Sequence, residues 1–215
     1  LVATRDIAAG ECFLAETPLL ITAPRTNENE ADASLQAFCE APEAVQAFVL
    51  EELWTPDMSA SSLESGDNET VQMMDEALGH ARIVSEHEWA KSYKAEVLQR
   101  ALLALNLNSH SFGGNVAAVF RLGSKINHAC HSNSLYSSSR RPGYGCHVAT
   151  RHIEAGTQLT TNYLGNQSLA GTPTRQEVLR AKKLFTCACE RCSAPGLSSR
   201  VPCPSCHPRD EDRLL

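Results

Sequence analysis

The heptapeptide NHACHSN at residues 127–133 places polar side chains directly after VAAVFRLGSKI (116–126), a stretch whose apolar residues look buried. An Asn-His pair alone is typical of a satisfied turn and says little about fold or function. Two further segments follow it in order, RHIEAGTQLTTNY at 151–163 and FTCACERC at 185–192. These segments decide the fold in combination, because each of them alone is a weak signal.

The last of these segments suggests a metal site. It supplies Cys187, Cys189 and Cys192, and tetrahedral zinc takes four ligands at about 2.3 Å when the ligands are sulfur. One ligand must therefore come from elsewhere in the chain. Ordinary reduced thiols are the alternative, although three cysteines at this spacing are uncommon without a metal. On spacing alone the candidates for the fourth ligand are Cys130, Cys203, Cys206 and His207, the last three of which form at most half of a second site.

Composition narrows the class of protein. Nine cysteines, with five of them in the last 29 of 215 residues, are poor material for a disulfide framework, so we expect a reducing, intracellular compartment. No apolar run approaches the roughly 20 residues of a membrane helix, which argues against a membrane protein. The opening stretch from Leu1 lacks a signal-peptide pattern, and we expect a fragment of a longer chain rather than a secreted precursor.

Charge is distributed unevenly along the chain. Between Arg25 and His80 there are 13 acidic residues and one basic residue, within a formal net charge of −6. This balance argues against direct binding of nucleic acid through that half. The acidic stretch is either a solvated helical face or an electrostatic guide for a basic polypeptide.

Strand signals lie on both sides of a helical middle. Residues 1–24 alternate short β-like runs with a turn at Gly10, and similar runs return at 115–165. TRDIAAGE (4–11) and TRHIEAGT (150–157) share the pattern T-R-x-I-x-A-G. We interpret them as two equivalent strand-turn-strand elements, each with a glycine where positive φ is convenient.

The middle of the chain has helical periodicity. Apolar residues recur three and four positions apart from about 30 to 107, which predicts an α-helical insertion. Within it, Ser85 and Glu88 form a capping-box pattern that predicts the start of a third helix. A further helix is predicted at 174–184. The predicted domain limits are an N-terminal part at 1–29, an acidic insertion at 30–107, a C-terminal part at 108–170 and a tail at 171–215.

The motifs together resemble those of the SET-domain protein lysine methyltransferases, and within them the SMYD-like and fungal branch, although no MYND finger is visible. The matching segments occur in the family's order and spacing, and the acidic helical stretch falls where the family carries a variable insertion. The resemblance covers residues 1–24 and 105–192. It rests on LVATRDIAAGE (1–11), NHACHSN, RHIEAGTQLTTNY and FTCACERC.

The resemblance implies a fold and a set of site residues. The implied fold is mainly β with an α-helical insertion (α+β), a SET-type β-knot followed by a small zinc-binding post-SET tail. Asn127 and His128 are similar to the pair that binds S-adenosyl-L-methionine, and Tyr163 is similar to the catalytic tyrosine beside that cofactor. Phe185 resembles the aromatic residue that packs against the cofactor and the lysine channel. Cys130 resembles the distant fourth ligand of Zn2+ that joins the cysteines of FTCACERC.

The implied function is transfer of a methyl group to a lysine side chain. The expected partner is a lysine-containing protein, including a basic histone tail, in the nucleus, the cytoplasm or both, without direct nucleic acid binding. Lys183 departs from the family, which usually places an aromatic residue there, and a cation in the channel would repel both cofactor and substrate unless it turns to solvent. This departure favours the alternative function, a catalytically weak or inactive SET-like zinc-binding interaction module.

Overall fold

The computed structural model describes residues 1–26, 28–58 and 67–194, and helices hold more of this part of the chain than strands do. The predicted predominance of strands is therefore wrong, and the fold is a mixed one with helices and several strands. The helical elements are α1 (Glu30–Glu40), α2 (Glu43–Ala47), the π-helical turn η1 (Phe48–Glu52), α4 (Asn68–Val84), α5 (Ala95–Asn108), the 3-10 turns η2 (Gly123–Lys125) and η3 (Gly165–Leu169), α6 (Thr172–Lys183) and α7 (Glu190–Ser193).

The strands of the described residues form three small sheets. Antiparallel pairing gives the orders β1-β7-β6 and β2-β4-β3, and the third sheet is the parallel pair β5-β8. The strands are β1 (Cys12–Glu16), β2 (Leu20–Thr22), β3 (His110–Ser111), β4 (Ala117–Val119), β5 (Asn127–His128), β6 (Ser134–Ser137), β7 (Gly145–Ala149) and β8 (Thr160–Thr161).

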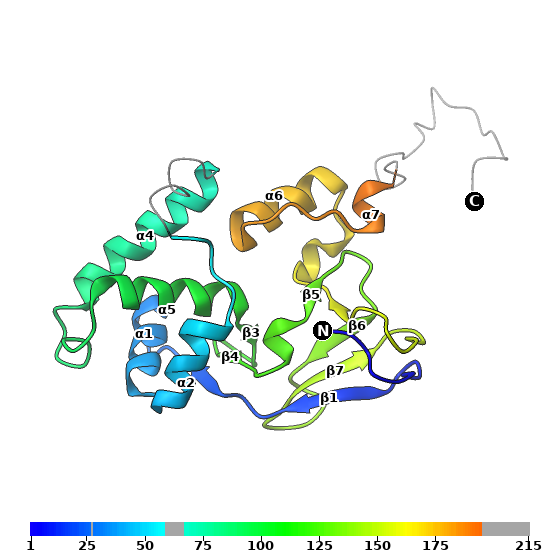
Figure 1. Cartoon of the computed structure of the whole chain (residues 1–215), viewed down its shortest axis with the longest axis horizontal. Helices are drawn as coiled ribbons and strands as arrows, with labels where there is room; N and C mark the ends of the chain where they lie inside the picture. The colour runs from blue at the N-terminus through cyan, green and yellow to red at the C-terminus, as the bar shows by residue number, and fades with distance from the viewer. Residues whose placement is uncertain (27, 59–66, 195–215) are drawn as a thin grey trace.

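Helices and strands occupy different sides of the molecule (Figure 1). Helices α1, α2, α4 and α5 gather at one side, the sheet of β1, β7 and β6 lies at the other, and α6 and α7 lie above the strands in this view. None of the helices in the described ranges is long and apolar enough to cross a membrane. The predicted domain limits remain a prediction.

The two T-R-x-I-x-A-G segments pair with each other. Ile7 donates its backbone N–H to Ile153 O at 2.8 Å, and Ile153 donates to Ile7 O at 3.0 Å. Gly10 and Gly156 have φ values of 80° and 83°, which confirms the expected left-handed glycines. Their sequence similarity therefore marks two halves of one antiparallel bridge.

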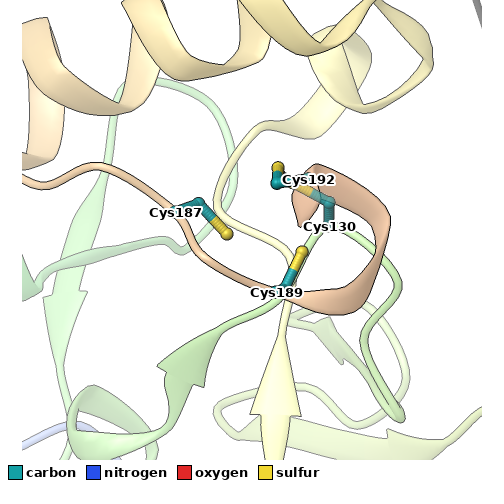
Figure 2. Close-up of side chains that lie close together, drawn as sticks. All are labelled: Cys130, Cys187, Cys189 and Cys192. Carbon is teal, nitrogen blue, oxygen red and sulfur yellow. Dashed lines mark hydrogen bonds between the residues drawn. The ribbon is translucent and has the colours of Figure 1, made fainter. Parts of the chain in front are cut away.

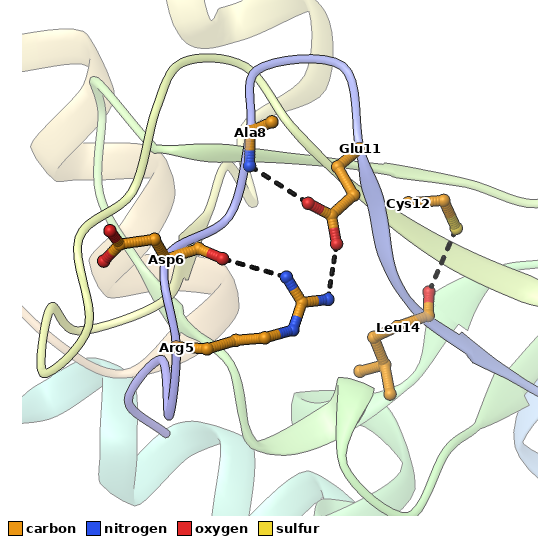
Figure 3. A network of polar contacts seen from close by, with 6 residues as sticks. All are labelled: Arg5, Asp6, Ala8, Glu11, Cys12 and Leu14. Atoms are coloured by element: carbon orange, nitrogen blue, oxygen red, sulfur yellow. Dashed lines mark hydrogen bonds and ion pairs between the residues drawn. The ribbon is translucent and has the colours of Figure 1, made fainter.

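The turn at Gly10 is stabilised by the carboxylate of Glu11 (Figure 3). The backbone N–H of Ala8 donates to it at 3.0 Å, and Arg5 donates to it at 2.5 Å and to Asp6 O at 2.9 Å. The hydrogen bond from Arg5 holds the pKa of Glu11 below its usual value. This network fixes the chain entering β1.

The stretch predicted as a helical insertion (30–107) contributes most of the largest apolar core of the described residues. Helix α5 lies at its centre, where it packs against α1, η1 and α4. Full burial of a leucine side chain contributes about 1.5–3 kcal/mol, so this helix anchors the insertion. Its buried apolar residues are Leu98, Ala101, Leu102, Leu103, Ala104, Leu105 and Leu107.

The third helix starts later than the capping-box pattern predicts. Ser85 is the C-cap of α4, where its Oγ donates to Arg82 O at 2.7 Å, and α5 begins only at Ala95. The intervening turns pack Trp89 and Tyr93 against the helical core. The Ser85 hydroxyl therefore caps the C-terminus of α4 and not the N-terminus of the next helix.

Helix α6 confirms the predicted helix at 174–184. Pro173 lies in its first turn, where a missing N–H has no cost. Its C-cap is Leu184, whose left-handed backbone (φ 58°) turns the chain toward Phe185. This reversal brings the cysteines of the tail back to the strands.

Candidate functional site

Two of the motifs meet through the parallel pair of β5 and β8. Asn127 lies opposite Thr160 and His128 opposite Thr161, so the chain leaving β8 carries Tyr163 to the side of His128. The backbone N–H of Tyr163 donates to His128 Nδ1 at 3.0 Å. The expected adjacency of these two segments is confirmed.

Tyr163 is held as a neutral phenol. Its hydroxyl donates to Ile126 O at 2.5 Å, and burial raises the pKa of Tyr163 to about 12. Phe185 stands edge-on to the Tyr163 ring with 6.5 Å between ring centroids. The hydroxyl is thus fixed at the end of an aromatic wall, where it can act as a hydrogen-bonding group but not as an anion.

His128 has one defined tautomer. Since its Nδ1 accepts the N–H of Tyr163, the proton of the neutral ring lies on Nε2, which is 3.3 Å from the Sγ of Cys130. Burial, followed by the charge of Arg175, lowers the pKa of His128 to about 4. The ring is therefore neutral at pH 7, and it connects the tyrosine to the cysteines.

A cavity of about 500 Å3 opens beside these residues, within the size range of small-molecule sites. Asn127, His128, Tyr163 and Phe185 all line it, so the structure brings the predicted cofactor and catalytic residues together on one surface. The insertion contributes Glu52, Leu53 and Trp54 to the wall, and further lining residues are Leu107, Asn108, Ser124, Lys125, Gln158 and Lys183.

Trp54 was not anticipated as a residue of the site. Trp54 lines the cavity and is 53% exposed, and its backbone carbonyl accepts a hydrogen bond from Asn108 Nδ2 at 2.8 Å. No local pattern marks it, because the loop after η1 reaches the cavity only through the packing of the insertion.

Lys183 does not turn to solvent. Its Nζ donates to Leu107 O at 2.7 Å and to Asn106 O at 3.4 Å, in the last turn of α5, where carbonyls lack helical partners. The ammonium also lies 5.6 Å from the centroid of the Tyr163 ring. Burial, followed by the charge of Lys182, lowers the pKa of Lys183 to about 8. A cation thus forms part of the cavity wall at pH 7.

The four predicted sulfur ligands converge behind this wall (Figure 2). The Sγ atoms of Cys130, Cys187, Cys189 and Cys192 all lie within 4.8 Å of one another. Four sulfurs around one tetrahedral zinc ion lie about 3.8 Å apart, so this donor set fits a zinc ion. Cys203, Cys206 and His207 lie outside the described residues.

The cysteines differ in ease of ionisation. Burial raises the pKa of the Cys130 thiol to about 12. Burial also opposes ionisation of Cys189, but the backbone N–H groups of Cys130 and Cys192 outweigh it and lower the pKa of Cys189 to about 6. One sulfur is therefore a thiolate at neutral pH and can begin to bind a metal.

Helix α6 positions the cysteine segment. The Gln176 side chain donates to Cys187 O at 2.6 Å and accepts from the Cys187 N–H at 2.9 Å. Arg175, beside it, is completely buried against the sulfurs. Neither was anticipated, although Arg175 lies four residues before the buried Leu179 and so on the apolar face of the predicted helix.

Comparison with known proteins finds relatives over part of the chain. The chain is 35% identical over 78 residues to a putative SET domain-containing protein of Acanthamoeba polyphaga mimivirus, a match that covers 36% of this chain and 29% of that protein. It is 36% identical over 78 residues to a histone-lysine N-methyltransferase of Meyerozyma guilliermondii, with 35% of this chain and 16% of that protein covered. The matched regions thus span less than a third of either relative.

Among solved structures, the fold is similar to the SET domain of LSMT bound to lysine and AdoHcy. The TM-score is 0.60 at 13% identity, and the match covers 86% of this chain and 50% of that chain. The sequence model of the SET domain family matches residues 1–164, most of the chain. The chain therefore belongs to the SET domain family.

Proposed function

We propose that the protein is an S-adenosyl-L-methionine-dependent protein-lysine N-methyltransferase of the SMYD-like branch. The observation that carries the proposal is the single cavity lined by Asn127, His128, Tyr163 and Phe185, which come from distant parts of the chain. The solved SET domain of similar fold binds lysine and AdoHcy, the demethylated form of this cofactor, which supports the proposed ligand class.

Each residue has a distinct role in this proposal. The Asn127 side chain and the His128 backbone hold the cofactor, and Phe185 packs against it. The bound cofactor supplies an electrophilic methyl group, so the protein must deliver a neutral amine in line with the breaking bond. A desolvated channel favours loss of the proton from a substrate lysine, whose ordinary pKa is near 10.4. The Tyr163 hydroxyl, fixed on Ile126 O, orients that amine.

The cysteine cluster has a structural role in the proposal. Cys130, Cys187, Cys189 and Cys192 would hold one zinc ion that joins the loop after β5 to the segment carrying Phe185. The aromatic wall of the cavity would then depend on the metal, because metal binding and local folding are linked.

The proposed substrate is a lysine-bearing protein, including a basic histone tail, in the nucleus or cytoplasm. Two features support a basic partner: the acidic composition of residues 25–80, and the contribution of Glu52 to the cavity wall. One relative is named a histone-lysine N-methyltransferase, which fits the same substrate class.

The position of Lys183 supports a second candidate function. Its ammonium in the cavity wall would oppose binding of a sulfonium and of a protonated lysine. This favours the alternative of a weakly active or inactive zinc-binding interaction module.

Calorimetric titration with S-adenosyl-L-methionine separates the two functions. A methyltransferase binds the cofactor, and Tyr163→Phe should then keep the affinity while lowering methyl transfer to lysine peptides. Absence of cofactor binding supports the interaction module. Unchanged turnover in Tyr163→Phe would remove this residue from its assigned role.

A further inference from the structure

Arg175 is the largest completely buried side chain among the described residues, with 0% exposure. A guanidinium remains protonated under all ordinary conditions, so a full positive charge lies in the interior. Buried charges in proteins are paired with opposite charges or bind metals. The identity of the counter-charge therefore needs an explanation.

The neutral oxygen partners of Arg175 do not supply this charge. Nη1 donates to Ala170 O at 2.5 Å and Nη2 donates to Thr172 Oγ1 at 3.0 Å. Within residues 1–26, 28–58 and 67–194, none of the ion pairs to a carboxylate involves Arg175. Its position at the N-terminal end of α6, the positive end of the helix dipole, makes a cation there still less favourable.

The remaining partners of Arg175 are sulfurs of the cysteine cluster. Nε donates to Cys130 Sγ at 3.3 Å, and Nη2 donates to Cys192 Sγ at 3.7 Å. Neutral thiols would leave the guanidinium without a counter-charge. Thiolates would provide it, because an anionic acceptor strengthens each of these hydrogen bonds.

A second donor points to the same sulfur. His128 carries its proton on Nε2, since Nδ1 accepts the N–H of Tyr163, and Nε2 lies 3.3 Å from Cys130 Sγ. Cys130 Sγ therefore faces one donor from His128 and another from Arg175. A sulfur between two donors is best suited to act as an acceptor only, as a metal-bound thiolate does.

From this arrangement we infer that Arg175 is the buried counter-charge and positioning residue of a tetrathiolate zinc centre, acting through the sulfurs of Cys130 and Cys192. A divalent ion with four thiolates carries a charge of about −2, which Arg175 reduces to about −1. Outer-shell groups of this kind orient metal ligands and tune their affinity. The inference rests on the zinc centre of the proposed function and adds to it a residue on which metal retention depends.

The test is zinc retention in the full chain, measured by competition with a chromogenic chelator. Arg175→Gln removes the charge but keeps a donor, and Arg180→Gln makes the same change at an exposed site on α6. We expect Arg175→Gln to lose about 10–100-fold in zinc affinity, the range for outer-shell partners, and Arg180→Gln to match the parent. Parent-like zinc affinity in Arg175→Gln would overturn the inference. If Arg175→Gln does not fold, the zinc affinity of Arg175→Met is measured instead. A loss of about 10–100-fold supports the inference, and a parent-like affinity overturns it.

Thermal unfolding of zinc-loaded and zinc-free protein provides a readout that a purely structural arginine would not change. A counter-charge predicts that Arg175→Gln lowers the melting temperature of the zinc form by more than that of the zinc-free form. Equal losses in both forms would show that Arg175 serves packing alone and overturn the inference. A parent protein that binds the cofactor but no zinc would also overturn it, and would leave the proposed methyl transfer standing.

Discussion

Replacing Lys183 by methionine should stabilise the protein at pH 7. The Lys183 ammonium is half-buried in the cavity wall, and burial together with the charge of Lys182 lowers its pKa from 10.5 to about 8. Between these values the unfolded chain binds a proton that the native state does not, so stability falls as the pH drops through this window. Below pH 8 the full penalty of the buried charge is present.

The magnitude follows from the pKa difference. The two pKa values of Lys183 differ by about 2.5, which corresponds to about 3 kcal/mol. The hydrogen bond from Nζ to Leu107 O, at 2.7 Å, offsets about 1 kcal/mol of this penalty. Lys183→Met should therefore raise the free energy of unfolding by about 2 kcal/mol at pH 7. At pH 10 the remaining penalty is about 1 kcal/mol, so the two proteins should be nearly equal in stability.

Urea unfolding of parent and variant at pH 7 and pH 10 measures both values. Arg180→Met is the matched control, because Arg180 is exposed on the same helix and does not contribute to the lowered pKa of Lys183. A Lys183→Met protein that is less stable than the parent at pH 7, or whose advantage does not shrink by pH 10, would refute this reasoning. Lower stability at pH 7 would show that the amine is stabilised by its carbonyl partners more than it is destabilised by burial. An advantage that does not shrink by pH 10 would show that its source is not the buried charge.

Three further predictions concern other parts of the molecule. Purified parent protein should contain about one equivalent of zinc, and Cys130→Ser should lose it and speed hydrogen exchange in the tail; less than about half an equivalent in the reduced parent would count against the site. Burial and the charge of His110 lower the pKa of His147 to about 3, so the unfolded chain binds a proton below pH 6.5 that the native state does not. Between pH 6.5 and 4.5 the parent should therefore lose about 2 kcal/mol of stability that His147→Gln does not lose, as urea titrations at several pH values would show. Changing the exposed α4 carboxylates of Glu69, Asp75 and Glu76 to amides should raise KM for a basic lysine peptide at low salt and leave kcat unchanged; an equal effect on a neutral peptide would argue against electrostatic guidance.

Local pattern was sufficient for the parts of the fold that depend on nearby residues. Local sequence predicted the helix at 174–184 and the left-handed glycines at Gly10 and Gly156, because helix periodicity and positive φ depend on a few consecutive residues. Local sequence did not predict where the third helix starts, since the Ser85 hydroxyl can cap the end of α4 or the start of a new helix. The packing of the following turns against the insertion core decided between these two uses.

The motifs of the chain determined which residues belong together at the site, and spacing alone left open the fourth ligand of the predicted zinc site. The parallel pairing of β5 with β8 and the return of the chain after Leu184 place Cys130 among the cysteines of the tail. Contacts between residues so distant in the chain depend on the whole path of the backbone. No window of sequence contains that information.

The tertiary structure alone decided the surroundings of two charged side chains. The sequence shows an arginine at position 175 and a lysine at position 183 on one amphipathic helix, and such residues usually face solvent. Arg175 instead faces the sulfurs of the cysteine cluster, and Lys183 faces the terminal carbonyls of α5. The acceptors come from elements far away in sequence. The partner of each charged side chain is therefore determined only when those elements pack together.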